Sequence, residues 1–439
     1  MKKILLLIFV LSAITTVPYW IGVETERQFT NFNQEFYPQA HLKLLESKYQ
    51  RGWFQSVAHS TFATMGTSNP VSNDNLFTFV HKIEHGFLPT QSTLIHTTLY
   101  TVSELSAKLT PKSEKTALLE VHTTVQTNGD STSTLTMPTL AISDNNYHLR
   151  WQGLQGYLYV KHNSATAQTD LHSPQIQFDT NKGRIVIQNV KLNLEVQFGP
   201  DSMQSVGSIS IADLQLSGKQ VPPVKLEGFQ LVGSNNFAND NLMVMAKTGL
   251  QQIHIGKKNY GPGYSDFELR NWHIPTLIHV KNTLVDIRRQ GLPPAQEANV
   301  AMFRLMPYGL ALLKNGPEFA ITSLHVNTPD GSVRGALQVK IPPFDGNIFT
   351  LFDPLALVKI LTAQLEMHIP ISILDNMTSQ TLSKEVSATR KMIGQLFNKW
   401  REQGILRVAE DQPNYYHSQM QLKEGILQVN GQQLPITIR

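Results

Sequence analysis

One pattern of apolar residues recurs along this chain and restricts how it folds. In the stretch RIVIQNVKLNL, Arg184 to Leu194, apolar residues alternate as in a β-strand and then slip by one position at Asn189. The side chains of a strand alternate between two faces, so an uncorrected slip would move every later side chain to the other face. The spacing therefore predicts a strand with a built-in bend.

The same slipped spacing occurs at several places in the chain, with a turn-tolerant residue just before the slip. These residues are Gly153, Asn189, Asp213, Gly228, Asn271 and Ser323. A β-bulge inserts one residue, bends the strand and favours residues that tolerate left-handed backbone angles. We therefore expect a mainly β (α+β) fold: an elongated, bulged and curved antiparallel sheet with helical insertions. The spacing between copies is irregular, which argues against a solenoid of fixed period.

The apolar residues of these stretches are predicted to share one face of the sheet. The candidates for positions that face an amphiphile are Ile185, Ile187, Ile209, Ile211, Leu226, Phe229, Leu269, Trp272 and Ile321. One interpretation is that this face forms a closed core, either in a sandwich or beneath the helical insertions. The other is an open groove that holds the acyl chains of a phospholipid or glycolipid. Periodicity alone leaves both interpretations open.

The amino terminus has the pattern of a membrane anchor. Lys2 and Lys3 precede the uncharged run from Ile4 to Val23, and acidic residues follow it. About 20 apolar residues span a hydrocarbon core of about 30 Å, and the positive-inside rule places the rest of the chain outside the cytoplasm. We expect residues 1–23 to be an uncleaved signal anchor that crosses the membrane once. A cleaved signal peptide is the alternative.

The remaining patterns divide the chain into segments. We expect a juxtamembrane helix at 24–40, a β-rich region at 41–274, a helical insertion at 275–316, strands at 317–350, a helical segment at 351–404 and C-terminal strands at 405–439. Within the later helical segment, helices are predicted over 353–366 and 377–402. A helix on the membrane surface is the alternative for 24–40, although this segment lacks a basic face.

Composition excludes several classes of protein. The 439 residues are 41% hydrophobic, which is enough for a sizeable core. Charged residues make up only 16%, and the net charge of +4 is spread without a basic stripe, so nucleic acid is not expected as a partner. The chain has no cysteine, which excludes disulfides, thiol catalysis and cysteine-ligated metal.

No sequence motif for catalysis or for a cofactor is found. The chain lacks a P-loop, a G-x-S-x-G nucleophile elbow and an H-E-x-x-H zinc motif. His254, His273 and His279 lie near one another in sequence, but apolar neighbours favour half-buried structural histidines over metal ligands. We therefore expect no enzyme, no cofactor and no metal site, and a periplasmic hydrolase has no support from motifs.

Several short motifs together resemble the YdgA/YihF family of bacterial proteins. They include KYQRGWFQSVAHS, IEHGF, WQGLQG, TPDGSVRG and the terminal GILQVNGQQLP. The matched residues are Tyr49, Arg51, Gly52, Trp53, Phe54, Ser56, His85, Gly86, Pro329, Gly331, Asn430 and Gly431. The family's His-Gly pair is usually followed by proline, whereas Phe87 follows here.

The resemblance implies an inner-membrane anchor, a large periplasmic body and no established catalytic residues. The bent strands are also similar, in shape only, to those of AsmA-like lipid-transport proteins, whose curled sheets present hydrophobic grooves to lipids. We therefore expect a non-enzymatic envelope protein whose curved sheet binds lipid, another amphiphile or an envelope partner. The alternative is a structural or interaction module with a closed core and no ligand, which dimerises through its helical insertions.

The matched residues near the amino terminus have predicted structural roles. Gly52 allows a bend, Trp53 fills the core, and Arg51 either caps the corner or pairs with an acidic neighbour. Glu84 and His85 are adjacent in a predicted strand, so their side chains point to opposite faces and do not act as an acid/base pair.

Overall fold

The structure is a computed structural model that describes residues 22–27, 29–30, 42–64, 76–85, 93–101, 117–143, 146–199, 202–219, 222–290, 292–344, 353–373 and 395–434. These residues are mainly β, as predicted, and their 24 strands form antiparallel pairs. The chain divides into two compact units. Unit 1 comprises Met1–Gly199 with Ile209–Val221, and unit 2 comprises Pro200–Ser208 with Pro222–Arg439.

The predicted membrane anchor lies almost wholly outside the described residues, which begin at Gly22. Helical residues are found at 22–27 and 29–30, at the start of the predicted juxtamembrane helix, and 31–40 are outside the described part. No described helix is long and apolar enough to cross a membrane. Most of the helix predicted over 377–402 also lies outside the description, which resumes at residue 395 with a helix over 395–402.

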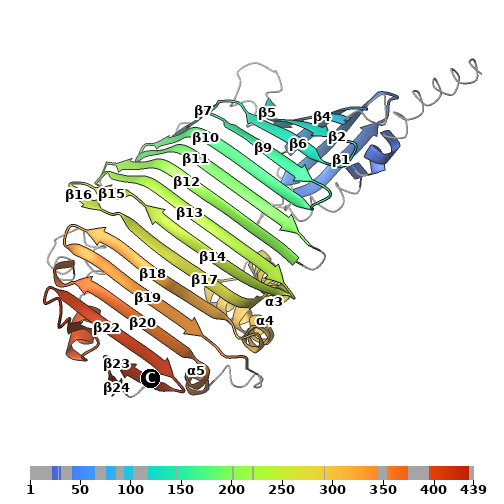
Figure 1. Cartoon of the computed structure of the whole chain (residues 1–439). Helices are drawn as coiled ribbons and strands as arrows, with labels where there is room; N and C mark the ends of the chain where they lie inside the picture. The colour runs from blue at the N-terminus through green and yellow to red at the C-terminus, as the bar shows by residue number, and fades with distance from the viewer. Residues whose placement is uncertain are drawn as a thin grey trace, which may run out of the picture. The chain divides into compact units, whose positions relative to one another are not determined.

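Unit 1 is a meander of strands (blue to green in Figure 1). Its strands are β1 (Leu42–Gln50), β2 (Gln55–Thr64), β3 (Leu76–Glu84), β4 (Thr93–Thr101), β5 (Ala117–Val125), β6 (Ser131–Met137), β7 (Leu140–Ser143), β8 (Tyr147–Trp151), β9 (Leu154–Lys161), β10 (Thr166–Thr180) and β11 (Gly183–Phe198). Strands pair in the order β1–β2–β3–β4–β5–β6–β9–β10–β11, and β7 and β8 form a hairpin whose second strand also pairs with β10. The next strand, β12 (Ser202–Gly218), is divided between the two units.

At one level of unit 1, the direct residue pairing between neighbouring strands is broken. The registers of the β6–β9 and β7–β8 pairs continue one another, so Pro138 lies opposite Gly153 at the interruption. Gly153 has a φ of +95°, and a Cβ at this position would lie 2.4 Å from the Met137 carbonyl oxygen. The predicted bend residue therefore has to be glycine for both conformational and steric reasons.

The same break continues into β10 and β11. Ser173 pairs with Val190 and Gln175 with Gln188, which places Pro174 opposite Asn189. Asn189 adopts the left-handed conformation, with a φ of +52°. No residue is inserted in this pair, because the register is the same on both sides of Pro174 and Asn189. The conformation predicted for this position is confirmed, but the predicted local register shift is not found between β10 and β11.

Unit 2 contains the remaining strands and the longer helices (yellow to red in Figure 1). Its elements are β13 (Val224–Ala238), β14 (Asn241–Leu250), β15 (Gln252–Ile255), β16 (Lys258–Tyr260), β17 (Gly263–His273), α3 (Ile274–Arg289), α4 (Pro294–Lys314), β18 (Glu318–Thr328), β19 (Gly331–Lys340), α5 (Pro354–Ile360), β20 (Thr362–Pro370), β21 (Arg407–Val408), β22 (Tyr415–Lys423), β23 (Ile426–Val429) and β24 (Gln432–Leu434). The main order is β13–β14–β17–β18–β19–β20–β22–β23–β24. Helices α3 and α4 contact each other and β17.

A true bulge occurs in β17, where the sequence predicts it. Leu242 pairs with Trp272 and Val244 with Leu269, so three residue steps in β17 match two in β14. Asn271 lies at the inserted position with a φ of +61°. Because Leu242 and Val244 share one face of β14, the bulge keeps Trp272 and Leu269 on one face as well.

A second bulge occurs in β18. Ile321 pairs with Phe267 and Leu324 with Ser265. Between these two pairs, β18 therefore has one residue more than β17. Gly228, in β13, also has a positive φ of +63°. Left-handed angles therefore occur at four of the predicted bend residues, whereas Asp213 and Ser323 are not among them.

The helix predicted over 353–366 is wrong in its second half. Helix α5 ends at Ile360, and β20 begins at Thr362. The sequence TAQLEMHIP alternates strictly, with Leu365 and Met367 on one face, and its strand pairs with both β19 and β22. Pairing on both sides supplies hydrogen bonds to the backbone along most of this strand, which outweighs the helical spacing of the preceding residues.

Fully buried apolar side chains are few among the residues that the structure describes. In unit 1, Ala58, Phe62 and Ile83 are buried between β2, β3 and their neighbours. In unit 2, Leu406 and Tyr416 form a cluster that includes Phe397, Trp400 and Met367 among the side chains packed on it. Most of the described strand residues remain partly exposed.

Candidate functional site

The sheet of unit 2 carries two rows of apolar side chains on one face, which we call the apolar rows. Directly paired residues of adjacent strands lie on the same face of a sheet. The first row consists of Phe267, Ile321, Leu337, Leu365 and Met420. The second consists of Leu269, Phe319, Val339, Ala363 and Leu422. All ten side chains are half-buried, so the described residues shield this face only in part.

The sequence-predicted amphiphile positions are all at least partly exposed. In unit 1, Ile185 and Ile209 are 39% and 36% exposed, and Ile187 and Ile211 are half-buried. In unit 2, the half-buried positions are Leu226, Phe229, Leu269, Trp272 and Ile321. The register places Leu269 and Ile321 in the apolar rows. None of the nine has the full burial typical of a closed core.

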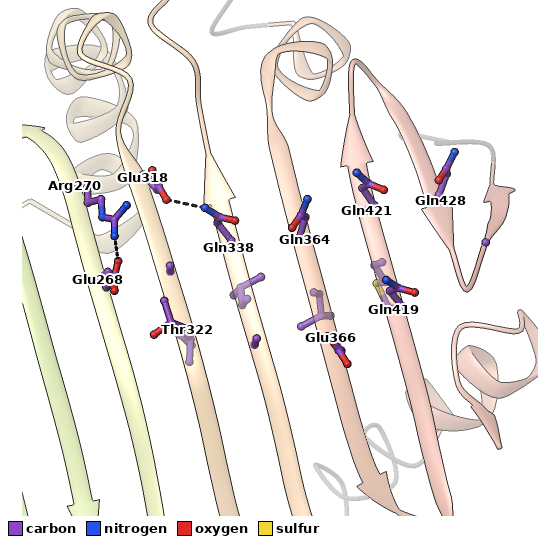
Figure 2. Close-up of a pocket in the computed structure, with 17 residues that line it drawn as sticks. Glu268, Arg270, Glu318, Thr322, Gln338, Gln364, Glu366, Gln419, Gln421 and Gln428 are labelled. Atoms are coloured by element: carbon purple, nitrogen blue, oxygen red, sulfur yellow. Dashed lines mark hydrogen bonds and ion pairs between the residues drawn. The ribbon is translucent and has the colours of Figure 1, made fainter. Parts of the chain in front are cut away.

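The opposite face of the same strands is polar. Five glutamines in direct cross-strand register form what we call the glutamine row: Gln338, Gln364, Gln421, Gln428 and Gln433. Figure 2 shows four of these side chains on adjacent strands, beside Glu318 and Arg270. Gln338, Gln364, Gln421 and Gln428 line a hollow of about 620 Å³ together with Glu366 and Gln419.

Ion pairs and hydrogen bonds order one end of this hollow. Gln338 Nε2 donates to Glu318 Oε1 at 2.7 Å, and the Glu318 residue is only 8% exposed. Arg270 forms an ion pair with Glu268, two residues away on the same strand, β17 (Figure 2). The sheet of unit 2 is therefore amphipathic, with the apolar rows on one face and the glutamine row on the other.

Four of the family-motif residues converge in unit 1, and we call them the motif cluster: Tyr49, Arg51, Ser56 and His85. Ser56 Oγ and His85 Nε2 are 2.8 Å apart and buried, and Tyr49 Oη donates to the Gly22 carbonyl at 3.5 Å. A Cβ on Gly22 would lie 3.2 Å from His85 Nε2 and 3.4 Å from Arg51 Cγ. The start of the helix at 22–27 therefore packs directly on the motif cluster.

Burial shifts the pKa of two residues of the motif cluster. Burial lowers the pKa of the His85 imidazole, and burial also raises the pKa of the Tyr49 phenol. His85 Nδ1 has no hydrogen-bond partner among the described residues. Glu84 is exposed while His85 is 4% exposed, which places the two side chains apart as predicted.

The segment from Arg51 to Phe54 forms a corner between β1 and β2. Arg51 Nη1 lies 3.0 Å from Glu26 Oε2, which confirms the predicted ion pair. Gly52 is required sterically, because a Cβ there would lie 2.1 Å from the Gln55 carbonyl oxygen. The prediction that Trp53 fills the core is wrong: Trp53 is 49% exposed, and Phe54 is exposed as well. The corner turns these rings outward, because the buried face of β2 starts only at Ser56.

The remaining motif residues shape two turns of unit 2. Gly331, with a φ of +128°, closes the β18–β19 turn after Pro329 and packs against Tyr415, whose Oη accepts a hydrogen bond from the Ser332 amide at 3.1 Å. Asn430 and Gly431 have φ values of +49° and +78° in the turn between β23 and β24. Gly86 lies outside the described residues.

The polar face was missed by sequence reasoning. The glutamines of β19, β20 and β22 each lie next to an apolar residue of the rows, and strand alternation alone predicts that they face the other way. Their alignment into one row depends on strand register, which needs the pairing partners. The alternation of polar residues along each strand indicates a polar face, but it does not indicate that the glutamines of different strands align in one row.

Comparison with known proteins gives a family but no activity. No curated protein matches the chain. The family model of a bacterial protein of unknown function, DUF945, matches residues 1–437. Because that match covers nearly the whole chain, the protein belongs to the DUF945 family of bacterial proteins of unknown function.

Proposed function

We propose that this protein is a non-enzymatic envelope protein that binds the acyl chains of a phospholipid or glycolipid on the apolar rows. Residues 1–23 would anchor it in the bacterial inner membrane, with the body in the periplasm. The motif resemblance to the YdgA/YihF proteins supports this topology, as does the charge pattern around the amino-terminal apolar run.

The observation that carries the proposal is the partial exposure of ten aligned apolar side chains on one sheet face. A contiguous apolar surface exposed to water is costly, at about 25 cal/mol for each Å². Such surfaces usually mark a binding site for an apolar ligand or partner. Bulges bend strands, so the bulges in β17 and β18 support a sheet curved around the bound chains.

An interaction module is the second candidate, and the helical insertion favours it. Phe303 and Met302 on α4 are 64% and 54% exposed, and Ile278 on α3 is exposed as well. Large apolar side chains exposed on neighbouring helices are typical of a protein–protein interface. As an interaction module, the protein would form a homodimer through α3 and α4 and would need no ligand on the sheet.

Counting co-purified lipid on a matched pair of variants tests the first proposal. Leu365→Glu places a charge in the apolar rows, and Gln364→Glu places the same charge on the opposite face of the same strand. The full-length chain would be purified in detergent, and its lipid content measured by mass spectrometry of organic extracts. We expect Leu365→Glu to lose lipid that Gln364→Glu retains. Equal lipid content in both folded variants would contradict the proposal, since lipid around the anchor is common to both.

A further inference from the structure

We propose that Glu366, His368 and His417, on the polar face of the unit 2 sheet, bind a divalent transition-metal ion of the Zn²⁺ class. This inference is independent of the lipid proposal, because the three residues lie on the face opposite the apolar rows. The three residues form no local sequence motif, because they come from strands about 50 positions apart in the chain.

The backbone brings the three side chains together. Glu366 and His368 are two residues apart in β20, so their side chains lie on the same face. His417 is the direct partner of His368 across the β20–β22 pair, and their rings stack with centroids 4.5 Å apart. The ligand atoms of all three residues lie within 4.8 Å of one another.

The spacing fits a metal with little rearrangement. A tetrahedral Zn²⁺ ion with bonds of about 2.1 Å holds its ligand atoms roughly 3.4 Å apart. Glu366 Oε1 and His368 Nε2 are 3.4 Å apart. The side chains of Glu366 and His368 are 60% and 31% exposed, and the His417 residue is half-buried, so rotation about side-chain bonds can close the remaining separation.

The ligand types select the metal. Two imidazoles with one carboxylate suit zinc and neighbouring first-row metals, and disfavour Ca²⁺ and Mg²⁺, which prefer oxygen ligands. Three protein ligands leave at least one coordination position open. Glu366 and His368 also line a hollow of about 560 Å³ with Tyr264, Arg334 and Asp411, so a further ligand has room to bind there.

Two arginines flank the histidines and affect the charge of the site. Arg334 is the direct cross-strand neighbour of His368 on β19, and Arg407 is that of His417 on β21. Arg407 Nη1 donates to the Asn430 carbonyl at 3.5 Å, which directs its charge toward the β23–β24 turn. A metal held by one carboxylate keeps a net positive charge, and with Arg334 beside it the open position favours an anionic ligand.

Zinc titration of the full-length, tag-free chain tests the proposal. After chelation and dialysis, isothermal calorimetry should report one Zn²⁺ ion per chain. His417→Ala and His368→Ala should each weaken binding at least about tenfold. His279→Ala is the control, because His279 is a histidine of α3 whose ring stacks on Tyr308 and which lines neither hollow. Absence of stoichiometric binding, or equal affinity in all variants, would overturn the site.

A second measurement keeps the test decisive if the variants misfold. X-ray absorption of the Zn²⁺-loaded wild-type chain should show two imidazole ligands and oxygen ligands in the first shell. A first shell with fewer than two imidazoles would refute the assignment without any mutation.

Discussion

Leu337 and Gln338 are consecutive residues of β19 that lie on opposite faces of the unit 2 sheet. Leu337 pairs with Ile321 and Leu365 in the apolar rows, whereas Gln338 pairs with Gln364 in the glutamine row. Because side chains alternate along the strand, one of these two neighbours lies on the proposed lipid surface and the other on the polar surface. Adjacent positions can therefore serve as each other's controls.

The buried hydrogen bond of the motif cluster should stabilise the fold. Ser56→Ala leaves the buried His85 Nε2 without its partner at 2.8 Å, which should lower the free energy of unfolding by about 1–3 kcal/mol. Ser143→Ala removes an exposed bond to His148 and should cost less than about 0.5 kcal/mol. Urea unfolding of both variants checks this. Equal, small losses would show that the motif cluster adds nothing to stability.

Stability should decrease as pH falls toward 4, because His81 is held neutral. Burial, with a smaller contribution from His59, lowers the pKa of His81 to about 4. The unfolded chain binds the proton at its ordinary pKa of about 6.5, so unfolding takes up a proton between these values and stability is lost as pH drops through that range. The buried His85, whose pKa is also lowered, acts in the same direction.

Unfolding free energies of the wild type and His81→Asn at pH 7 and pH 5 measure this effect. The wild type should lose more stability than the variant over that interval, by roughly 1–2 kcal/mol. An identical pH dependence in both proteins would show that His81 titrates normally in the folded state.

Asn430 should be worth more to the fold than an ordinary turn residue. Its Nδ2 donates to the Gly404 and Ile405 carbonyls at 2.8 and 3.0 Å, and its Oδ1 accepts from the Gln419 amide at 2.8 Å. Asn430→Ala removes these bonds and strains a left-handed residue, which should cost roughly 2–4 kcal/mol.

The control for Asn430 is Asn239→Ala. Asn239 has a similar φ of +50°, and its side chain makes no hydrogen bond with the described residues. Only the backbone strain of about 1 kcal/mol is then expected. Thermal or urea unfolding that ranks the two variants equally would contradict the role given to the Asn430 side chain.

The exposed face of α4 should determine oligomeric state if the interaction module is correct. Phe303→Asp should shift a dimer toward monomer in analytical ultracentrifugation, with at least about a tenfold weaker association. Arg304→Asp is the control at the adjacent, non-apolar position. A wild-type chain that is monomeric at all concentrations would exclude this second function.

Much of the fold could be predicted because strand alternation is a local signal. The bend at Asn271 is an example: apolar spacing located it, and the residue type identified the left-handed conformation. The predictions that are wrong concern segments whose structure depends on contacts with distant parts of the chain. The residues from Thr362 to Glu366 are predicted to be helical, and only their pairing with β19 and β22 makes them a strand. The core position predicted for Trp53 is wrong, because the corner at Gly52 turns its ring outward.

The candidate sites were predictable only in part. Leu269 and Ile321 were identified as apolar positions, but their membership in the apolar rows follows from cross-strand register. Register depends on which strands pair, and a single sequence does not specify strand order. For the same reason Glu366 and His417 could not be connected before the β20–β22 pair was known.

Site-specific photo-crosslinking at Leu337 and Gln338 tests the central claim most directly. A benzophenone amino acid would replace each residue in turn in the full-length chain. The cells would be irradiated intact, and the mass of the protein would then be measured by mass spectrometry. The account predicts an adduct of phospholipid or glycolipid mass at position 337 and none at position 338. Lipid adducts of equal yield at both positions, or none at position 337 in a folded protein, would contradict it.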